Sequence, residues 1–359
     1  MKARLITELD NFYSLEEQWR SLCYDLENNE VFYSWEWICS FIKSFGDSAL
    51  VPYIVVVEEN NKEIIGIAPL CIEERNIGFK KIKVLRFIVN RTVDYYNFII
   101  SKKYSKYEVI KNIVKELKED KSWDLIELKN LNTRDRETLM INEVIKLYKD
   151  LVCIKEESVI TPYMRYEEIN LKANSKQIKD IIRREKKLLR EHQVEFFINA
   201  GWDKEVWNEL MKLHKERWPQ SVFNSLKYIE FYEDIIPKLE KDNLLEFSYV
   251  SIDNEISAIH FGFKNEEKVY YYIPIYSSNH GKTGIGAILL NKIIDNYKES
   301  HNIFDFLRGD ELYKFDWTDM STQNYNYYIT REKEKYIANY FNVTVAVKKS
   351  KAIRRLLNK

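Results

Sequence analysis

Cysteine is rare in this chain of 359 residues, and its four cysteines, Cys23, Cys39, Cys71 and Cys153, lie far apart. None forms a C-x-x-C pair, so the sequence predicts no metal site and no disulfide framework. Long apolar runs are also missing, because no stretch reaches the roughly 18 residues that a membrane-spanning helix needs. The first residues turn acidic too early for a secretory leader, and we therefore expect a cytoplasmic protein.

An excess of charge of either sign is missing too, since 56 basic and 56 acidic residues give a formal net charge of zero. Dedicated nucleic-acid binders usually carry a basic excess, so we expect no nucleic-acid partner. Hydrophobic residues make up 45% and aromatic residues 14% of the chain, which excludes a disordered protein. At roughly 150 residues per domain, the length predicts about two domains.

Glycine is scarce as well, with nine residues where ordinary usage of about 7% would give roughly 25. Three of the nine, Gly281, Gly284 and Gly286, lie within six positions. Because glycine lets the backbone bend sharply and approach a ligand closely, this cluster marks a candidate binding loop.

Hydrophobic periodicity alternates between helical and strand repeats along the chain. Helices are expected at 14–28, 34–45, 104–118, 134–149, 177–192, 204–217, 226–239 and 284–297, and strands at 52–57, 64–72, 83–89, 97–100, 124–128, 194–198, 245–252, 255–263, 268–275 and 304–307. The hairpin pattern of residues 53–68 is repeated weakly at 247–260. We therefore expect an α/β protein of two related units, at 1–155 and 156–342, followed by a basic tail at 343–359.

The strongest local feature is a strand, a glycine-containing loop and a helix across residues 268–297. Free N–H groups at the start of a helix, at the positive end of its dipole, form a site for anions such as phosphate. One interpretation is a P-loop, although Tyr276 stands where G-x-x-x-x-G-K-[ST] needs its first glycine. The second is a loop for the diphosphate of coenzyme A, in which Lys282 supplies a positive charge. The third is an ordinary tight turn before a helix.

The segment from Phe304 to Trp317 (Phe-Asp-Phe-Leu-Arg-Gly-Asp-Glu-Leu-Tyr-Lys-Phe-Asp-Trp) favours the coenzyme A interpretation. It resembles the D-F-x-R-G-D-x-x-Y-K-x-x-W segment of the GNAT-superfamily acetyltransferases named after the cellulose-biosynthesis protein CelD. Further likenesses to this family lie, in the same order as in the family, at Asn29–Trp37, Ile67–Leu70, Asp94-Tyr95 and Leu213–Trp218. The resemblance covers roughly residues 15–320.

This resemblance implies a fold of tandem GNAT-like units, each a mixed, mainly antiparallel central sheet flanked by helices, related to Fem-type transferases. The implied activity is transfer of an acyl group, most simply acetyl from acetyl-CoA, to an amine without a metal. The implied acceptor is an amino-sugar or similar polar small molecule of cell-envelope polysaccharide synthesis. The implied CoA-binding residues are Ile275, Tyr276, Lys282, Thr283, Gly284, Ile285, Gly286 and Ala287.

Acyl transfer requires a base for the amine and N–H donors for the carbonyl oxygen, which gains charge. The candidate bases are Asp94, His260 and Asp310, with a structural hydrogen bond, a satisfied core histidine and an ion pair to Arg308 as their structural alternatives. Pro274 has no N–H, so we expect the donor to be the amide of Ile275 or Tyr276. The Tyr276 hydroxyl is a candidate acid for the thiolate. The resemblance suggests further substrate contacts at Tyr95, Arg217, Arg308, Tyr313 and Lys314.

Two basic segments remain. The helix at 176–190 is either a solvated face or a surface for an anionic substrate. The tail from Lys348 carries six basic and no acidic residues, so it is either a frayed terminus or a peripheral contact with an anionic membrane. Nothing in the sequence indicates an oligomeric state.

Two other functions stay open. A Fem-type transferase that uses aminoacyl-tRNA usually carries an inserted helical hairpin arm, whereas the basic helix here is single and short. A catalytically degenerate GNAT-fold protein that serves as a partner in polysaccharide assembly is the non-enzymatic alternative.

Overall fold

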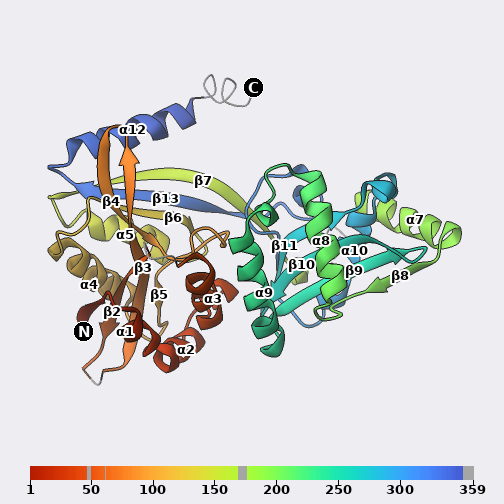
Figure 1. The fold of residues 1–359 in the computed structure, drawn as a ribbon, viewed down its shortest axis with the longest axis horizontal. Helices are drawn as coiled ribbons and strands as arrows, with labels where there is room; N and C mark the ends of the chain where they lie inside the picture. The colour runs from red at the N-terminus through yellow and green to blue at the C-terminus, as the bar shows by residue number, and fades with distance from the viewer. Residues whose placement is uncertain (47–49, 61, 169–175, 351–359) are drawn as a thin grey trace. The chain divides into compact units, whose positions relative to one another are not determined.

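The computed structural model describes residues 1–46, 50–60, 62–168 and 176–350 (Figure 1). The chain divides into two compact units. Unit 1 comprises Met1–Val159 and Gln323–Lys359, and unit 2 comprises Ile160–Thr322. In the part of the chain that is described, no helix is long and apolar enough to cross a membrane.

The sheet of unit 1 has the strand order β1, β2, β3, β4, β6, β13. Its neighbours are antiparallel except for β4 and β6, which run parallel and are joined by the crossover helix α4. The strands are β1 (Lys2–Ile6), β2 (Val51–Glu58), β3 (Ile64–Ile77), β4 (Lys80–Phe87), β6 (Leu125–Asn132) and β13 (Ser321–Arg331), with β5 (Ile99–Ile100) paired to β3.

Local sequence signals explain the helices of unit 1. Ser34 accepts a hydrogen bond from the amide of Trp37, and Ser105 accepts one from Glu108, so both serines cap a following helix. The expected helix at 14–28 is shorter, since α2 spans Glu16–Tyr24, and the unpredicted helix α1 precedes it. The helices are α1 (Leu9–Tyr13), α2 (Glu16–Tyr24), α3 (Trp35–Phe45), α4 (Lys106–Glu119), α5 (Glu137–Ile145) and α12 (Lys335–Lys349).

The sheet of unit 2 has the order β12, β11, β10, β9, β8, with the last residues of β7 antiparallel to β12. Only β11 and β12 are parallel among these pairs, and α10 crosses between them. The elements are the end of β7 (Leu151–Arg165, of which residues 151–159 belong to unit 1), α7 (Lys176–Glu191), β8 (Val194–Phe197), α8 (Lys204–Arg217), α9 (Leu226–Lys241), β9 (Leu245–Ile252), β10 (Glu255–Lys264), β11 (Lys268–Tyr276), α10 (Ile285–Tyr297), β12 (Ile303–Asp305) and α11 (Leu312–Phe315).

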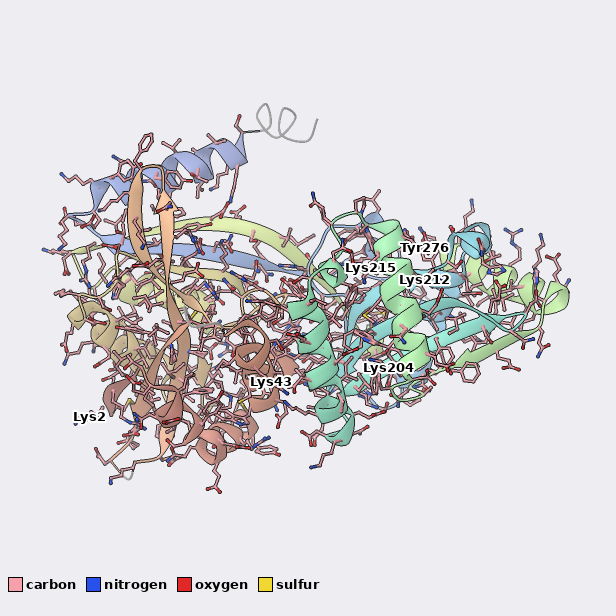
Figure 2. All side chains as sticks on the ribbon, in the orientation of Figure 1. Lys2, Lys43, Lys204, Lys212, Lys215 and Tyr276 are labelled. Carbon is pink, nitrogen blue, oxygen red and sulfur yellow. The ribbon has the colours of Figure 1, made fainter. Side chains whose placement is uncertain are left out.

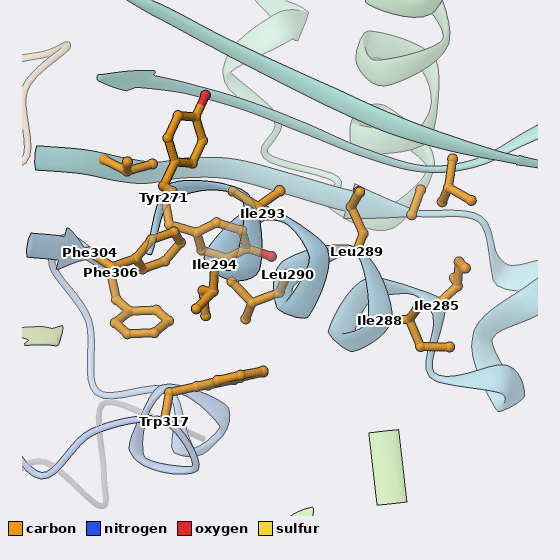
Figure 3. Packing of buried hydrophobic residues seen from close by; sticks show 14 of the residues in the cluster. Tyr271, Ile285, Ile288, Leu289, Leu290, Ile293, Ile294, Phe304, Phe306 and Trp317 are labelled. Carbon is orange, nitrogen blue, oxygen red and sulfur yellow. The ribbon is translucent and has the colours of Figure 1, made fainter. Parts of the chain in front are cut away.

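Helices cover both faces of the unit 2 sheet. Phe261 of β10 packs against Trp207 of α8 and Tyr232 of α9. Ala258 lies on the other face and belongs to the buried cluster that α10 and α7 form. Figure 3 shows the isoleucines and leucines of α10 in this cluster, together with Phe304, Phe306 and Trp317. The start of α10 is thereby held rigidly against the sheet.

The two units repeat one topology. The order β2, β3, β4, α4, β6 in unit 1 corresponds to β9, β10, β11, α10, β12 in unit 2, and each order contains one parallel pair. The weak repeat of the sequence falls on the corresponding hairpins, β2–β3 and β9–β10. The predicted fold, α/β with mixed and mainly antiparallel sheets flanked by helices, is confirmed.

The boundaries of the units differ from the expected ranges 1–155 and 156–342. Residues 323–342 lie in unit 1 because β13 pairs with β6. Residues 160–165 of β7 lie in unit 2, where β7 pairs with β12. The sequence predicted neither β7 nor β13, nor the helix α12 that follows. The end of the expected basic tail, 351–359, is outside the described residues.

Candidate functional site

The glycine loop forms a sharp turn between β11 and α10. Ser277 caps a short 3₁₀ helix, η4 (Ser278–Thr283), by accepting a hydrogen bond from Asn279 N. Gly284 then adopts a left-handed conformation with φ of 76°, and α10 starts at the next residue. A side chain at this φ would be strained, which explains the glycine. The amides of Ile285 and Gly286, the first two of α10, have no acceptor within the helix and point out of its start, whereas the amide of Ala287 donates to the carbonyl of Gly284 at 3.0 Å.

Tyr276 lies over this loop at the end of β11. A Cβ atom on Gly286 would lie 3.0 Å from Cδ1 of the Tyr276 ring, and one on Gly281 would lie 3.8 Å from Cε2. The small size of both residues therefore leaves room for the ring. Gly281 itself is exposed, while Thr283, Gly284, Gly286 and Ala287 are half-buried. The loop is thus at the surface and not covered by the core.

Arg217 joins the same group of residues from the end of α8. Its guanidinium carbon lies 4.2 Å from the centre of the Tyr276 ring, and its Nη2 donates to the tyrosine hydroxyl at 3.0 Å. Figure 2 shows Tyr276 beside this helix. The structure therefore brings together Tyr276, Arg217 and the glycine loop, which the sequence predicted as parts of one site.

A second arginine approaches the loop from α7. The Nη1 atom of Arg184 lies 2.9 Å from the position of a Cβ on Gly284. Its Nε is paired with Asp180 at 2.6 Å on the same helix. A cation beside the positive end of a helix dipole is unfavourable unless an anion lies between them. The arrangement of Arg184 and the start of α10 therefore fits an anionic ligand.

Other predicted loop residues use their side chains to support the structure. Thr283 donates its hydroxyl proton to the carbonyl of His280 at 2.6 Å, so this side chain holds the loop together. Ile285 is buried in the core below α10. The side chain of Lys282 is outside the described part of the structure. What the loop offers a ligand is mainly its backbone amides.

Strand β11 has a free edge close to the loop. Its parallel pairing with β12 ends at Tyr270 and Asp305, although β11 continues to Tyr276. On the opposite edge of β11, the amide of Ser277 donates to the carbonyl of Ser257 in the neighbouring strand β10 at 2.9 Å.

The alternation of an antiparallel ladder then directs the amide of Ile275 toward β10 and that of Tyr276 away from it. Of the two expected amide donors, the structure therefore favours Tyr276. Pro274 lies at the other outward position, where an amide would have no partner in the ladder.

His260 is a core residue. Its Nδ1 is hydrogen-bonded to the carboxylate of Glu246, and its Nε2 accepts the amide of Tyr272 at 3.1 Å. His260 and Glu246 are both fully buried. Both ring nitrogens are thus used, and Nδ1 carries the proton. This corrects the prediction of His260 as a base, because no lone pair remains for a substrate amine.

The segment that follows β12 is a tight turn held by Lys314. The Nζ of this buried lysine donates to the carbonyl of Arg308 at 2.8 Å and pairs with Glu311 at 2.9 Å. Lys314 therefore stabilises the turn and is not available for the predicted substrate contact. Asp310 and Tyr313 are exposed on the turn and remain candidates, as does Arg308.

Two predicted residues lie in unit 1. Tyr95 is buried, and its hydroxyl donates to Glu30 at 3.2 Å. This corrects its prediction as a substrate contact. Asp94 is half-buried, and its carbonyl accepts from Asn324 at 3.2 Å. Its role as a base remains a prediction.

Sequence reasoning missed three residues of this region. Arg184 belonged to the basic helix, but nothing local connected it with Gly284. Glu246 lies on strand β9, and a glutamate is more often exposed than buried. Gly262 has its missing Cβ 2.4 Å from Cε1 of His260, so it leaves room for the ring. The scarcity of glycine was the one signal that pointed to this position. The described residues contain no cluster of three or more side chains able to hold a metal.

Comparison with known proteins agrees with this geometry. Residues 175–315 match the family model described as an acetyltransferase (GNAT) domain. Among solved structures, FemX superposes with a TM-score of 0.59 at 12% identity, covering 91% of this chain and 97% of FemX. No curated protein sequence matches significantly.

Two further solved structures are similar. A conserved protein of unknown function from Bacteroides thetaiotaomicron gives a TM-score of 0.55 at 9% identity, covering 88% of this chain and 97% of its own. The C-terminal domain of a putative lysylphosphatidylglycerol synthetase from Agrobacterium fabrum gives 0.51 at 8% identity, covering 93% and 96%. Such low identities show the fold alone. The chain therefore shares the fold of these solved structures, and its segment 175–315 in unit 2 matches an acetyltransferase (GNAT) domain.

Proposed function

We propose that this protein is an acyl-CoA-dependent N-acyltransferase whose unit 2 binds the diphosphate of CoA at the start of α10. The observation that carries the proposal is left-handed Gly284 at the helix start with Arg184 beside it. The outward amides supply hydrogen bonds, and the arginine supplies the charge that a diphosphate needs. The GNAT-domain match over 175–315 supports the same ligand.

The free edge of β11 suits the thioester end of the donor. The Tyr276 amide points away from β10, so it is available to donate to the thioester carbonyl as this oxygen gains charge. The amine of the acceptor attacks this carbon, the bond to sulfur breaks, and a base removes the proton from nitrogen. Arg217 donates to the Tyr276 oxygen, which leaves the hydroxyl proton free to transfer to the departing thiolate. Asp310 and Asp94 are the remaining candidates for the base.

The acceptor that we propose is an amino-sugar or similar polar amine of cell-envelope polysaccharide synthesis, and the acyl group is acetyl. Support comes from the segments that resemble the CelD-like acetyltransferases. A cytoplasmic location agrees with this donor.

A Fem-type transfer from aminoacyl-tRNA is a weaker candidate, because α7 leads directly to β8 without a second arm helix. A P-loop function is also weaker. Tyr276 occupies the position of the first glycine in the P-loop pattern. The helix α10 starts only after Gly284, which follows Lys282 and Thr283.

Calorimetric titration with acetyl-CoA tests the donor. Gly284→Val forces a branched side chain into the left-handed region and against Arg184, so we expect binding to be abolished. Gly201→Val is the matched control, since Gly201 also has positive φ, at 84°, but lies before α8. Unchanged affinity in Gly284→Val would contradict the proposal. Micromolar binding of ATP with magnesium would favour the P-loop instead.

A further inference from the structure

The exposed side of α12 in unit 1 is unusually apolar. Ile337, Ala338, Phe341 and Val345 form the buried side and pack against Ile77, Ile82 and Val84 of the sheet. Tyr336, Tyr340 and Val343 are 51%, 44% and 63% exposed. At helical spacing, these three residues form a second stripe on nearly the opposite side of α12. A surface helix normally has one apolar stripe, so the second stripe calls for a partner.

The turn between β3 and β4 extends this stripe. Phe79 at its tip is fully exposed. The hydroxyl of Tyr336 donates to the carbonyl of Ile77 at 3.3 Å, and Gly78 leaves room for that hydroxyl, since a Cβ there would lie 2.5 Å from it. Lys80 pairs with Glu334 at 2.6 Å. The turn that carries Phe79 is therefore fixed to the start of α12.

The charges around this stripe are mostly positive. Lys80 and Lys81 follow Phe79, and from Lys335 to Lys349 the helix carries three lysines and no acidic residue. Among the described residues, neither Lys335 nor Lys349 has an acidic partner. Lys80, Lys81 and Lys348 are paired with Glu334, Glu74 and Glu156 respectively. A stripe of aromatic and aliphatic side chains beside lysines is typical of helices that lie on anionic membranes.

We propose that this face, formed by Phe79, Tyr336, Tyr340 and Val343 with Lys335 at its border, binds the surface of an anionic lipid bilayer. Lysines at the headgroups gain from the negative surface potential. Phe79 and Val343 have no polar group and gain only by entering the acyl region, which a soluble polyanion does not offer. The tyrosines combine an aromatic ring with a polar hydroxyl, which suits the interface. The face thus fits a bilayer and not a nucleic acid or an anionic polysaccharide.

Flotation of the full chain with lipid vesicles tests the proposal. We expect binding to vesicles of phosphatidylcholine mixed with phosphatidylglycerol, weaker binding to phosphatidylcholine alone, and a decline with added salt. The triple variant Phe79→Ser, Tyr340→Ser, Val343→Ser should weaken binding at least about tenfold, because it removes the apolar contacts. Lys335→Gln should weaken it roughly fivefold.

The matched controls lie elsewhere on unit 1. Tyr24→Ser removes an exposed aromatic residue from α2, and Lys115→Gln removes an exposed lysine from α4. Both should bind vesicles like the unaltered protein. All substituted side chains are exposed, so thermal unfolding should stay unchanged.

Three outcomes would overturn the proposal. The first is equal vesicle binding by the triple variant and the unaltered chain, and the second is no vesicle binding at all. The third is a dimer in analytical ultracentrifugation that the triple variant dissociates, which would identify the face as an interface between copies. None of these outcomes depends on acetyl-CoA binding, so the proposed enzymatic function is tested separately.

Discussion

The backbone amide of Tyr272 donates to Nε2 of His260, 3.1 Å away, at the point where β11 carries one residue more than β10. The register of the two strands passes from Phe261–Ile273 to Phe263–Tyr270, which leaves a bulge in β11. The imidazole thus accepts an amide that the ladder does not pair. Glu246 fixes the other ring nitrogen, and Tyr271 stacks on the ring at 4.5 Å between centres. His260 therefore acts as a positioning residue for β11 and the amide of Tyr276.

Two substitutions of His260 separate the two hydrogen bonds of its ring. The amide group of Gln reaches the position of Nε2, and that of Asn reaches the position of Nδ1. We expect His260→Gln to keep the bond with Tyr272 and His260→Asn to lose it. An unpaired buried amide costs about 1–3 kcal/mol, and a shift of β11 by about 1 Å would cost up to 100-fold in rate.

The measurements are hydrogen exchange of the Tyr272 amide, the acetyl-CoA dissociation constant and kcat/KM. Exchange should accelerate in the Asn variant and stay slow in the Gln variant, and kcat/KM should fall in the Asn variant and be retained in the Gln variant. A His260 that served as a base would lose activity equally in both variants, and slow exchange in both would also contradict this role.

The helices α3 and α4 of unit 1 were predictable because their signals are local. Ser34 and Ser105 mark two helix starts, and the apolar spacing of the residues after them defines the buried side. The strands β7 and β13 were not predictable, since β13 finds β6 almost 200 residues earlier in the chain: Asn324 lies opposite Asn132. The polar composition of β13 resembles that of a loop. Only tertiary pairing makes them strands.

The candidate site likewise has a part that could be predicted from the sequence and a part that could not. The turn at Gly284 and the helix that follows it were readable, because glycine clustering and helix periodicity lie within a few residues. The sequence did not decide whether His260 is a base or a core residue. Its hydrogen bonds depend on Glu246 of the adjacent strand and on a shift in register, which a single sequence does not specify. Likewise, Arg184 and Gly284 are 100 positions apart, and only the packing of α7 against α10 brings them together.

The lowered pKa of His214 predicts that the stability of the protein depends on pH. This histidine of α8 stacks on Trp218 at 4.3 Å between ring centres, and its Nδ1 lies 2.7 Å from the hydroxyl of Ser221. Burial lowers its pKa to about 4 from the ordinary value of 6.5. Between these values the unfolded chain binds a proton that the folded chain does not, so the free energy of unfolding falls as the pH drops from 6.5 to 4.

Because His214 is half-exposed, we expect a contribution of about 1–2 kcal/mol and not the full value of the shift. Urea denaturation at several pH values measures it. His214→Asn, which cannot take up this proton, should show a shallower decline between pH 6.5 and 4. The same slope in both proteins would assign the pH dependence to other groups.

Arg184 and Arg183 provide the sharpest test of the anion site, because they are neighbours on α7 with different surroundings. Arg184 lies against Gly284, whereas the side chain of Arg183 is 79% exposed and pairs with Asp180 alone among the described residues. A charge-assisted hydrogen bond to phosphate contributes about 1.5–3 kcal/mol. Arg184→Gln should therefore weaken acetyl-CoA binding by roughly 10-fold to 100-fold, since 1.4 kcal/mol corresponds to about tenfold.

Arg183→Gln removes the same charge from the same helix and should change the dissociation constant less than about twofold, through screened long-range attraction alone. Titration calorimetry at two salt concentrations distinguishes the contributions, because a direct contact with the diphosphate persists at high salt better than a diffuse attraction does. Equal weakening by the two variants would mean that α7 attracts the ligand only through its overall charge. In that case the start of α10 would bind CoA without a contact from Arg184, and the guanidinium beside Gly284 would have to move aside when the diphosphate enters.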